Sequence, residues 1–453
     1  MPHDDTIAAL STPPGRGALA VVRVSGPLSG RLMRDVFSLK KEIVVRRAYF
    51  GRYRSVCGKV LDECVATYFA EGQSFTGEAM LELSLHGNPL IVEEVLDDLF
   101  ARGCRPAEPG EFSRIAYLND RIDLTQAEAI ADLIAANSEQ SIIRAREQLS
   151  GALCLEVNRV SGEIVSVVAE LEAYLDFPDE DLPTENDGIV LSRLRELVFR
   201  LREVVDSQRL RRVVEEGLRV AIVGIPNAGK SSLMNALLES ERSIVSSFAG
   251  TTRDYLEGSL NLNGLRIQLL DTAGLGLESH NKVEAEGMRR SLVKAESADL
   301  ILFVVDAAAQ RPTLADKVTE LLERQTVLLV ENKSDLGGYH SDAGFLPTVS
   351  RVSVSAKCGN GMDVLRGTIV ETLTRANLVP EADAWVVNQR QAQCFKNTEL
   401  SVEHALQCLK AKEGAEVALI HLRDALEALG SVVGQIDSEA ILDELFSNFC
   451  IGK

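Results

Sequence analysis

Long apolar runs, paired cysteines and a leader-like N-terminus are all missing from this sequence. Its apolar runs, such as Leu300–Val305 and Val327–Val330, fall far short of the roughly 20 residues that a transmembrane helix needs. The eight cysteines form no Cys-x-x-Cys pair, which argues against a zinc knuckle or a disulfide framework. The segment Met1–Thr6 has no basic start and no apolar stretch, so we expect no secretory leader, no membrane association and a cytoplasmic location.

Basic residues are scarce relative to acidic ones. The chain has 48 Lys and Arg residues against 67 Asp and Glu residues, which gives a formal net charge of −19. Proteins that bind nucleic acid unaided usually carry a basic surface. A role on RNA would therefore need a local basic patch or a partner.

The apolar pattern divides the 453 residues into four segments. Residues 1–118 alternate strand-like runs with one helical stretch, as in a small α/β domain. Residues 119–216 have helical spacing, residues 217–375 alternate strands and helices as in a parallel sheet, and residues 376–453 are helical again. We therefore predict a multidomain protein, partly α/β and partly all-α, whose helical domain is interrupted by an inserted α/β domain.

Local signals set helix limits in the second segment. Thr125-Gln-Ala-Glu128 has the spacing of a capping box, which predicts that a long helix or a pair of helices begins there. Pro178 and Pro183 interrupt the helical pattern, because proline disfavours helical geometry in the residue before it. A further helix is expected over roughly 189–216.

A glycine-rich motif follows the apolar run Val220–Val223. It reads Gly224-Ile-Pro-Asn-Ala-Gly-Lys-Ser231 and precedes an apolar helix, the strand-loop-helix setting of a phosphate-binding loop. The Lys side chain would reach the outer phosphates and the Ser hydroxyl would ligate Mg²⁺. The alternative is a glycine-containing surface turn. The loop's predicted nucleotide contacts are Asn227, Ala228, Gly229, Lys230, Ser231 and Ser232.

Four further segments occur in the order that a GTPase needs. Thr252, in Gly250-Thr251-Thr252-Arg253, offers a hydroxyl to Mg²⁺, and Asp271 would face the metal through water. Asp335 can accept hydrogen bonds from the N1–H and amino group of guanine, a donor pair that adenine lacks. These segments predict a Ras-like P-loop GTPase domain with a mostly parallel sheet. The remaining contacts expected from them are Thr272, Ala273, Gly274, Asn332, Lys333, Ser355, Ala356 and Lys357.

The residue after Gly274 is Leu275, where small signalling GTPases carry the Gln that orients the attacking water. Leucine cannot hold water in this way. Polar side chains further along the chain are candidates, although each could equally belong to a solvated surface: Glu278, His280, Glu284 and Glu286.

Several motifs together resemble the tRNA-modification GTPase family called MnmE or TrmE. Besides the GTPase motifs they are Thr12-Pro-Pro-Gly-Arg-Gly17, Ser74-Phe-Thr-Gly-Glu78, Pro109-Gly-Glu-Phe-Ser113, Asp123-Leu-Thr-Gln-Ala-Glu-Ala-Ile130, Asp176-Phe-Pro-Asp-Glu180 and Phe449-Cys-Ile-Gly-Lys453. The resemblance implies a homodimer formed through the N-terminal domain and an FAD-containing partner of the MnmG or GidA type. Such pairs add an aminomethyl or carboxymethylaminomethyl group to C5 of the wobble uridine in tRNA.

The family's folate site corresponds to Arg23, Glu82, Arg121 and Lys453. A 5-formyl- or methylene-tetrahydrofolate carries glutamyl carboxylates and a pterin, which suit Arg and Glu. The family has Lys at the position of Arg121, Arg at the position of Glu108, and His-Gly-Gly where this chain has His86-Gly87-Asn88. Without the resemblance, a structural ion pair would be the simpler reading of Arg23 and Glu82.

The resemblance also implies activation of hydrolysis by K⁺ and by dimerisation of the GTPase domains. The implied K⁺ ligands are Asn227, Ser246, Phe248 and Thr251, and Glu284 matches the family's water-positioning glutamate. Further implied nucleotide contacts are Ser247, Ala249 and Gly250.

Cys450 is the one cysteine with a functional interpretation. It follows an amphipathic stretch close to the C-terminus, so its thiol either takes part in catalysis or lines a site.

Two other functions compete with that of a GTPase in a tRNA-modifying complex. A regulatory or ribosome-assembly GTPase switch would use the same nucleotide motifs. However, assembly GTPases usually append a basic module, whereas residues 376–453 hold six Lys and Arg against twelve Asp and Glu. A weaker alternative makes the N-terminal domain a catalyst in its own right.

Overall fold

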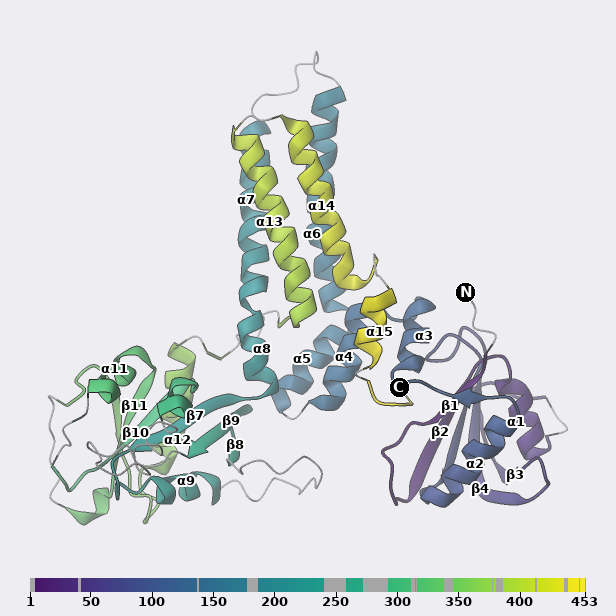
Figure 1. The fold of residues 1–453 in the computed structure, drawn as a ribbon, viewed down its shortest axis with the longest axis horizontal. Coiled ribbons are helices and arrows are strands. Elements are labelled where there is room, and N and C mark those ends of the chain that lie inside the picture. Colours follow the sequence, from purple (N-terminus) through teal and green to yellow (C-terminus); the bar gives the residue numbers. More distant parts are fainter. Residues whose placement is uncertain are drawn as a thin grey trace. The chain divides into compact units, whose positions relative to one another are not determined.

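In the computed structural model the chain folds into two compact units, and Figure 1 shows their helices and strands. One unit comprises Met1–Ala135, Ala145–Phe199 and Cys394–Lys453, and the other comprises Ala136–Arg144 and Arg200–Gln393. The described residues are 5–39, 42–136, 138–176, 186–239, 258–271, 292–310, 314, 316–337, 345–376, 378–379, 386–411, 414–435, 439–447 and 449–452.

The N-terminal domain is built on a six-stranded sheet with the order β3-β4-β5-β2-β1-β6. Neighbouring strands are antiparallel, except for the parallel pair β1 and β6. Side chains alternate between the two faces, so one face carries the apolar core and the other is partly open. The strands are β1 (Ile7–Leu10), β2 (Leu19–Ser25), β3 (Ala48–Arg54), β4 (Val60–Phe69), β5 (Met80–His86) and β6 (Arg105–Pro106).

Three helices cover this sheet. Helices α1 (Ser29–Phe37) and α2 (Pro89–Ala101) pack on the core face, and α3 (Glu111–Leu118) packs on the other. Asn88 is the N-cap of α2, because its Oδ1 accepts a hydrogen bond from the Leu90 amide at 3.0 Å.

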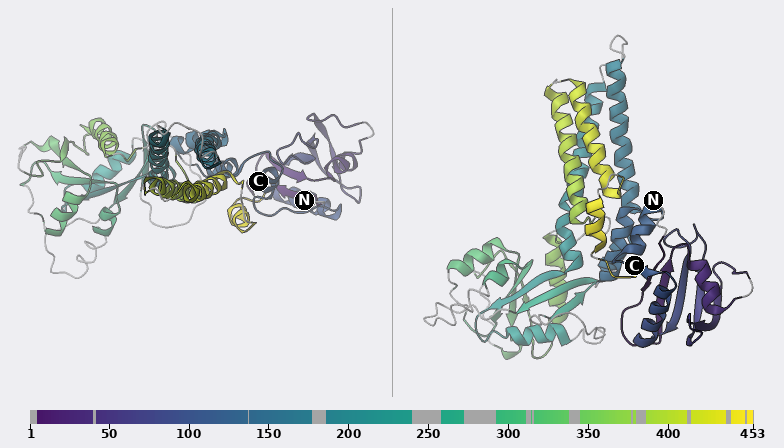
Figure 2. Two further views of the ribbon diagram at one scale, coloured as in Figure 1. Left: turned by 90° about the horizontal axis from the view of Figure 1, so that it is seen from above. Right: turned by 45° about the vertical axis from the view of Figure 1, so that its right-hand side comes forward.

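The same unit contains most of the helical domain, whose residues 136–144, 200–216 and 386–393 belong to the other unit. Helix α14 packs along α6, and an Arg423–Glu172 ion pair of 2.7 Å joins them. Figures 1 and 2 show both helices within an elongated bundle. The helices of residues 119–216 and 376–453 are α4 (Leu124–Ala135), α5 (Glu139–Leu149), α6 (Ala152–Asp176), α7 (Asn186–Asp206), α8 (Gln208–Glu215), α13 (Gln389–Ala411), α14 (Ala415–Val433) and α15 (Glu439–Ser447).

The capping box lies two residues before the predicted one. The Asp123 amide donates to Gln126 Oε1 at 3.0 Å, and the Gln126 amide donates to Asp123 Oδ1 at 2.8 Å. The expectation that Thr125 and Glu128 form the box is therefore wrong, because Asp123 offers a better acceptor and both predicted residues are already inside α4. The helix expected over 189–216 is divided at Ser207.

The end of the chain lies on the N-terminal domain. Leu442 and Phe446 of α15 pack with Leu124 in a small apolar cluster. Ile451 forms an antiparallel bridge with Pro109, beyond the last residue of the edge strand β6. The Ser11 hydroxyl donates to the Gly452 carbonyl at 2.9 Å, so the tail borders the end of β1.

The second unit contains an α/β domain whose sheet has the order β12-β11-β10-β7-β9-β8. All neighbours are parallel except β8 and β9. Helices α9 and α12 pack on one face and α11 on the other. The elements are β7 (Leu218–Gly224), α9 (Lys230–Glu239), β8 (Ser259–Leu262), β9 (Leu265–Asp271), β10 (Leu300–Asp306), α11 (Asp316–Arg324), β11 (Val327–Asn332), β12 (Ser350–Ser353) and α12 (Met362–Arg375).

The predicted fold class is confirmed: a small N-terminal α/β domain, a helical domain, and a domain with a mostly parallel sheet inserted into it. Within the described residues, each helix is too short or too polar to cross a bilayer.

A buried polar network joins the β3–β4 hairpin to α2. The Tyr53 hydroxyl donates to Asp98 Oδ2 at 2.9 Å, and Arg102 Nε donates to the same oxygen at 2.7 Å. The Val56 amide donates to Asp98 Oδ1 at 2.7 Å. Burial, together with the nearby Asp98 charge, raises the pKa of Tyr53 well above its ordinary value, so the hydroxyl remains a donor.

We predict that Tyr53→Phe lowers the stability of the N-terminal domain by about 1–2 kcal/mol, because a buried carboxylate loses one of its donors. Tyr49→Phe is the matched control. It removes a hydroxyl from the same strand, and that hydroxyl accepts a hydrogen bond from the exposed amide of Val44. Urea unfolding followed by hydrogen exchange in the N-terminal domain measures both variants. Equal destabilisation would contradict a special role for the Asp98 network.

Candidate functional site

The phosphate-loop motif connects β7 to α9. A Cβ atom at Gly224 would lie 2.2 Å from the Val304 carbonyl oxygen, so only glycine allows β7 to pair with β10 there. Gly229 has φ of +91° and Asn227 has φ of +63°, both in the left-handed region. Such turns direct successive backbone amides into a concave surface that suits an anion.

The N-terminus of α9 faces this loop. Lys230 Nζ donates to the carbonyl oxygens of Gly224 at 3.1 Å and Ile225 at 2.9 Å, so its ammonium group lies against the loop. Ser231 and Ser232 are exposed in the first turn of α9. A helix N-terminus, a lysine and free hydroxyl groups are the features that a phosphate and its cation require.

Asn332 joins the phosphate loop to the segment after β12. Its side chain is buried, and its Nδ2 donates to the Ala228 carbonyl at 2.9 Å. Its Oδ1 accepts a hydrogen bond from the Ala356 amide at 3.0 Å. A Cβ atom at Gly229 would lie 2.3 Å from this Nδ2, which is a second reason for glycine in the loop.

Lys333 adds a second link across the loop. Its Nζ donates to the Asn227 carbonyl at 2.7 Å and to Asp306 Oδ2 at 2.8 Å. Partial burial raises the pKa of Asp306. Hydrogen bonds from Lys333 and the Ala308 amide lower this pKa by more, so it lies below its ordinary value. Asp306 was not among the residues predicted to form the site. The sequence feature that could have identified it is the position of an acidic residue directly after the apolar run Leu300–Val305, at the carboxyl end of a strand.

Asp335 and Ser355 form the other side of the site. The Ser355 hydroxyl donates to Asp335 Oδ1 at 2.6 Å and accepts from the Cys358 amide at 3.2 Å. The hydrogen bond from Ser355 is the main reason that the pKa of Asp335 is lowered. A charged carboxylate fixed in this way can accept hydrogen bonds from two donors on one edge of a base.

The predicted nucleotide residues are thus brought together in part. The loop residues 227–230, the segment 332–335 and the segment 355–357 meet at the carboxyl ends of β7, β11 and β12. Asp271 ends β9 in the same sheet. The following predicted residues lie outside the described part of the chain: Ser246, Ser247, Phe248, Ala249, Gly250, Thr251, Thr252, Thr272, Ala273, Gly274 and Glu284.

A second group of predicted residues lies in the N-terminal domain. Arg23 on β2 and Glu82 on β5 are opposite each other in register, and their side chains form an ion pair of 2.9 Å. The two side chains keep 29% and 27% of their surface exposed, so a ligand can reach them. Arg121 lies beside the loop 72–78, since its Cγ is 3.2 Å from where a Cβ of Gly77 would be.

The C-terminal residues approach the same domain. Cys450 is exposed and has a free thiol, and its carbonyl accepts from the Gly110 amide at 3.4 Å. Lys453 is outside the described residues, but Gly452 lies against Leu10 and Ser11 of the β1 end.

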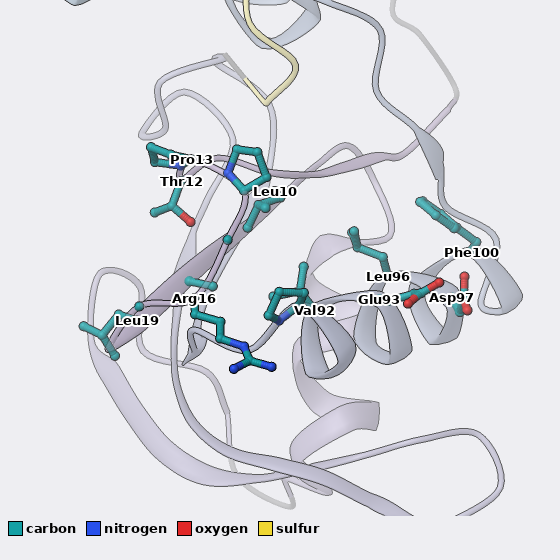
Figure 3. Close-up of a pocket in the computed structure, with 15 residues that line it drawn as sticks. Leu10, Thr12, Pro13, Arg16, Leu19, Val92, Glu93, Leu96, Asp97 and Phe100 are labelled. Carbon is teal, nitrogen blue, oxygen red and sulfur yellow. The ribbon is translucent and has the colours of Figure 1, made fainter. Parts of the chain in front are cut away.

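A pocket of about 570 Å³ lies elsewhere in this domain (Figure 3). Its walls are the loop after β1, which carries Arg16, and one side of α2, which carries Glu93 and Asp97. Its floor is apolar and includes Val92 and Leu96. None of the described residues predicted to bind a ligand lines this pocket.

The parallel sheet, the phosphate loop and the linked segments at residues 332–335 and 355–357 define a P-loop GTP-binding domain inserted into a helical domain. Comparison with known proteins agrees with this class. The family model of the N-terminus of the GTP-binding protein TrmE matches residues 6–121, and the family model of the MnmE helical domain matches residues 124–450.

Curated relatives match over their full length. The tRNA modification GTPase MnmE of Opitutus terrae is 42% identical, with 100% of each chain covered. The proteins of the same name from Acinetobacter baylyi and Aquifex aeolicus are 39% and 37% identical, covering 100% and 99% of this chain and 98% and 100% of theirs. The chain therefore belongs to the MnmE family of tRNA modification GTPases.

We predict that Asp335→Asn weakens GTP binding about 10²-fold and improves the binding of xanthosine triphosphate. An Asn side chain offers a donor to the C2 oxygen of xanthine, whereas it opposes the C2 amino group of guanine. Fluorescent nucleotide titration measures both affinities. Asp363→Asn, which removes an exposed carboxylate paired with Arg366 in the same domain, should leave them unchanged. Undiminished GTP affinity in Asp335→Asn would remove this residue from the guanine site.

Proposed function

We propose that this GTPase works in a tRNA-modifying complex with an FAD-containing partner of the MnmG or GidA type. With a tetrahydrofolate one-carbon donor, the complex would add an aminomethyl or carboxymethylaminomethyl group to C5 of the wobble uridine. The observation that carries the proposal is the placement of the C-terminal tail on the N-terminal domain that also holds the Arg23–Glu82 pair. A nucleotide switch alone would not need that arrangement.

The N-terminal residues fit a folate. Arg23 can pair with a glutamyl carboxylate, and Glu82 can accept hydrogen bonds from a pterin. Both are accessible although they pair with each other, and Arg121 brings a second guanidinium near the loop 72–78. Arg121 keeps the charge of the family's Lys and adds a planar donor set. The bound folate would supply the one-carbon unit, and we assign Lys453 to the same site.

The loop residues fit the two cations of a GTPase. The Ser231 hydroxyl is exposed for Mg²⁺, with Thr252 and, through water, Asp271 as its proposed companions. The Asn227 side chain is exposed and makes no hydrogen bond to the described residues, so its oxygen is available to K⁺. We propose Ser246, Phe248 and Thr251 as the other K⁺ ligands. The cations would neutralise charge on the phosphates.

Glu284 is our proposal for the residue that positions the attacking water. Lys230 would hold the outer phosphates, and the carboxylate would accept a hydrogen bond from the water so that the water oxygen faces the phosphorus. Leu275 cannot make this hydrogen bond.

A homodimer through the N-terminal domain is supported by the open face of its sheet. Phe50 and Val65 are opposite each other in register, and they are 75% and 37% exposed. Leu19 at the start of β2 is 66% exposed. Apolar side chains gathered on one sheet face favour association with a second surface.

We predict that GTP turnover rises about 10²-fold when K⁺ replaces Na⁺, because a correctly sized cation stabilises charge that develops during hydrolysis. Asn227→Gly should abolish the difference and retain GTP binding. Glycine is the suitable replacement since it accepts the φ of +63° at this position. Phosphate release in the two salts measures the effect, and equal rates in the unmodified chain would contradict the potassium proposal.

We predict that Cys450→Ser and truncation after Gly452 reduce tRNA modification and leave GTP turnover unchanged. The tail lies on the N-terminal domain, so its loss should alter that site alone. Mass spectrometry of tRNA nucleosides from a deletion strain, complemented with each variant, measures modification. Cys57→Ser is the matched control, because Cys57 is another exposed free thiol. Full modification in both tail variants would exclude the tail from the mechanism.

A further inference from the structure

Asp62 in β4 is a buried carboxylate that holds an imidazole in place. Its side chain is 6% exposed, and its Oδ1 lies 2.7 Å from Nδ1 of His86. Two backbone amides also donate to it: Glu63 N to Oδ1 at 2.9 Å and His86 N to Oδ2 at 2.8 Å. Three donors thus hold the carboxylate, and one of them is the His86 ring.

This geometry selects one tautomer of His86. A carboxylate is an acceptor only, so Nδ1 must carry the proton that Asp62 receives as a hydrogen bond. Nε2 of the neutral ring then presents its lone pair. The side chain is 66% exposed and makes no other hydrogen bond to the described residues, so Nε2 is open to solvent or a ligand. An imidazole oriented by a buried carboxylate is the arrangement that proton transfer needs.

A purely structural role does not account for the ring. The His86 amide already joins the end of β5 to β4 through Asp62 Oδ2, and that hydrogen bond does not involve the imidazole. Because the His86 ring is largely exposed, it buries little apolar surface and so adds little to the stability of the fold. Cys64 does not compete as a base, because burial and then the Asp62 charge raise the pKa of its thiol to about 12.

The Cβ atom of His86 lies on the same side of β5 as the proposed folate residue Glu82, while its ring reaches Asp62, the neighbour of the core residues Tyr53 and Cys64. Side chains alternate along β5, so Glu82, Ser84 and His86 point to the same side. Four residues of strand place His86 about 13 Å from Glu82, at about 3.3 Å per residue. A tetrahydrofolate has its pterin, aminobenzoyl and glutamyl groups in line, and such a ligand at Arg23 and Glu82 can extend to His86.

We propose that His86, positioned by Asp62, is a proton-transferring residue of the N-terminal domain. This inference rests on the proposed function, in which this sheet face binds the tetrahydrofolate donor. Nε2 accepts a proton from an N–H or O–H group of the bound reactants, and the electron pair of that bond stays on the reactant atom. The imidazolium is stabilised by the Asp62 carboxylate and returns its proton to water.

His86→Gln tests this role in the full chain with its FAD partner and tRNA. Gln can still donate a hydrogen bond to Asp62, but it cannot exchange a proton near neutral pH. We expect the modification rate to fall about 10²-fold, while the melting temperature, GTP turnover and affinity for 5-formyltetrahydrofolate stay unchanged. Added imidazole should restore part of the rate in His86→Ala, a rescue that a structural role would not show.

Glu63→Gln is the matched control, since it removes a neighbouring carboxylate that pairs with Arg52 at 2.7 Å on the protein surface. It should modify tRNA at the normal rate. A normal rate in His86→Gln would overturn the inference and leave the folate site standing. Failure of the unmodified chain to bind 5-formyltetrahydrofolate would instead contradict the proposed function, and the rate of His86→Gln would still decide the role of His86.

Discussion

The nucleotide site depends on one carboxamide, that of Asn332. It lies at the carboxyl end of β11, where it donates to the phosphate loop at Ala228 and accepts from the amide of Ala356. Because the group is buried, either bond left unmade would cost about 1–3 kcal/mol. The loop that would hold the phosphates and the segment that would cover the base are therefore fixed to one another through this side chain.

The close packing around Asn332 explains why small residues recur at this edge of the sheet. Gly229 leaves room for the Asn332 amide, and Gly224 lets β7 approach the carbonyl of Val304 on β10. Two lysine side chains also pack against this loop. Lys230 and Lys333 both donate to carbonyl oxygens of the loop, and Lys333 also pairs with Asp306. The phosphate loop thus presents the Lys230 ammonium group and the N-terminus of α9 where an anion would bind.

Motifs that depend on neighbouring residues could be predicted from the sequence, whereas contacts between distant residues could not. The phosphate loop and the start of α2 follow from local turn and helix chemistry. The cap of α4 shows the limit of that method, because Asp123–Gln126 and Thr125–Glu128 both have suitable spacing and only the former forms the box. Asp306 was missed because its partner Lys333 is 27 residues away in the chain.

The N-terminal domain shows the same limit over longer distances. Asp62 and His86 are 24 residues apart, and Ser11 and Gly452 are 441 apart. Gly452 has φ of +90°, and a Cβ there would lie 2.2 Å from the Leu10 carbonyl. The tail thus completes the edge of a sheet that begins more than four hundred residues earlier. Because the intervening chain includes the whole GTPase domain, no local sequence pattern could have predicted this contact between Ser11 and Gly452.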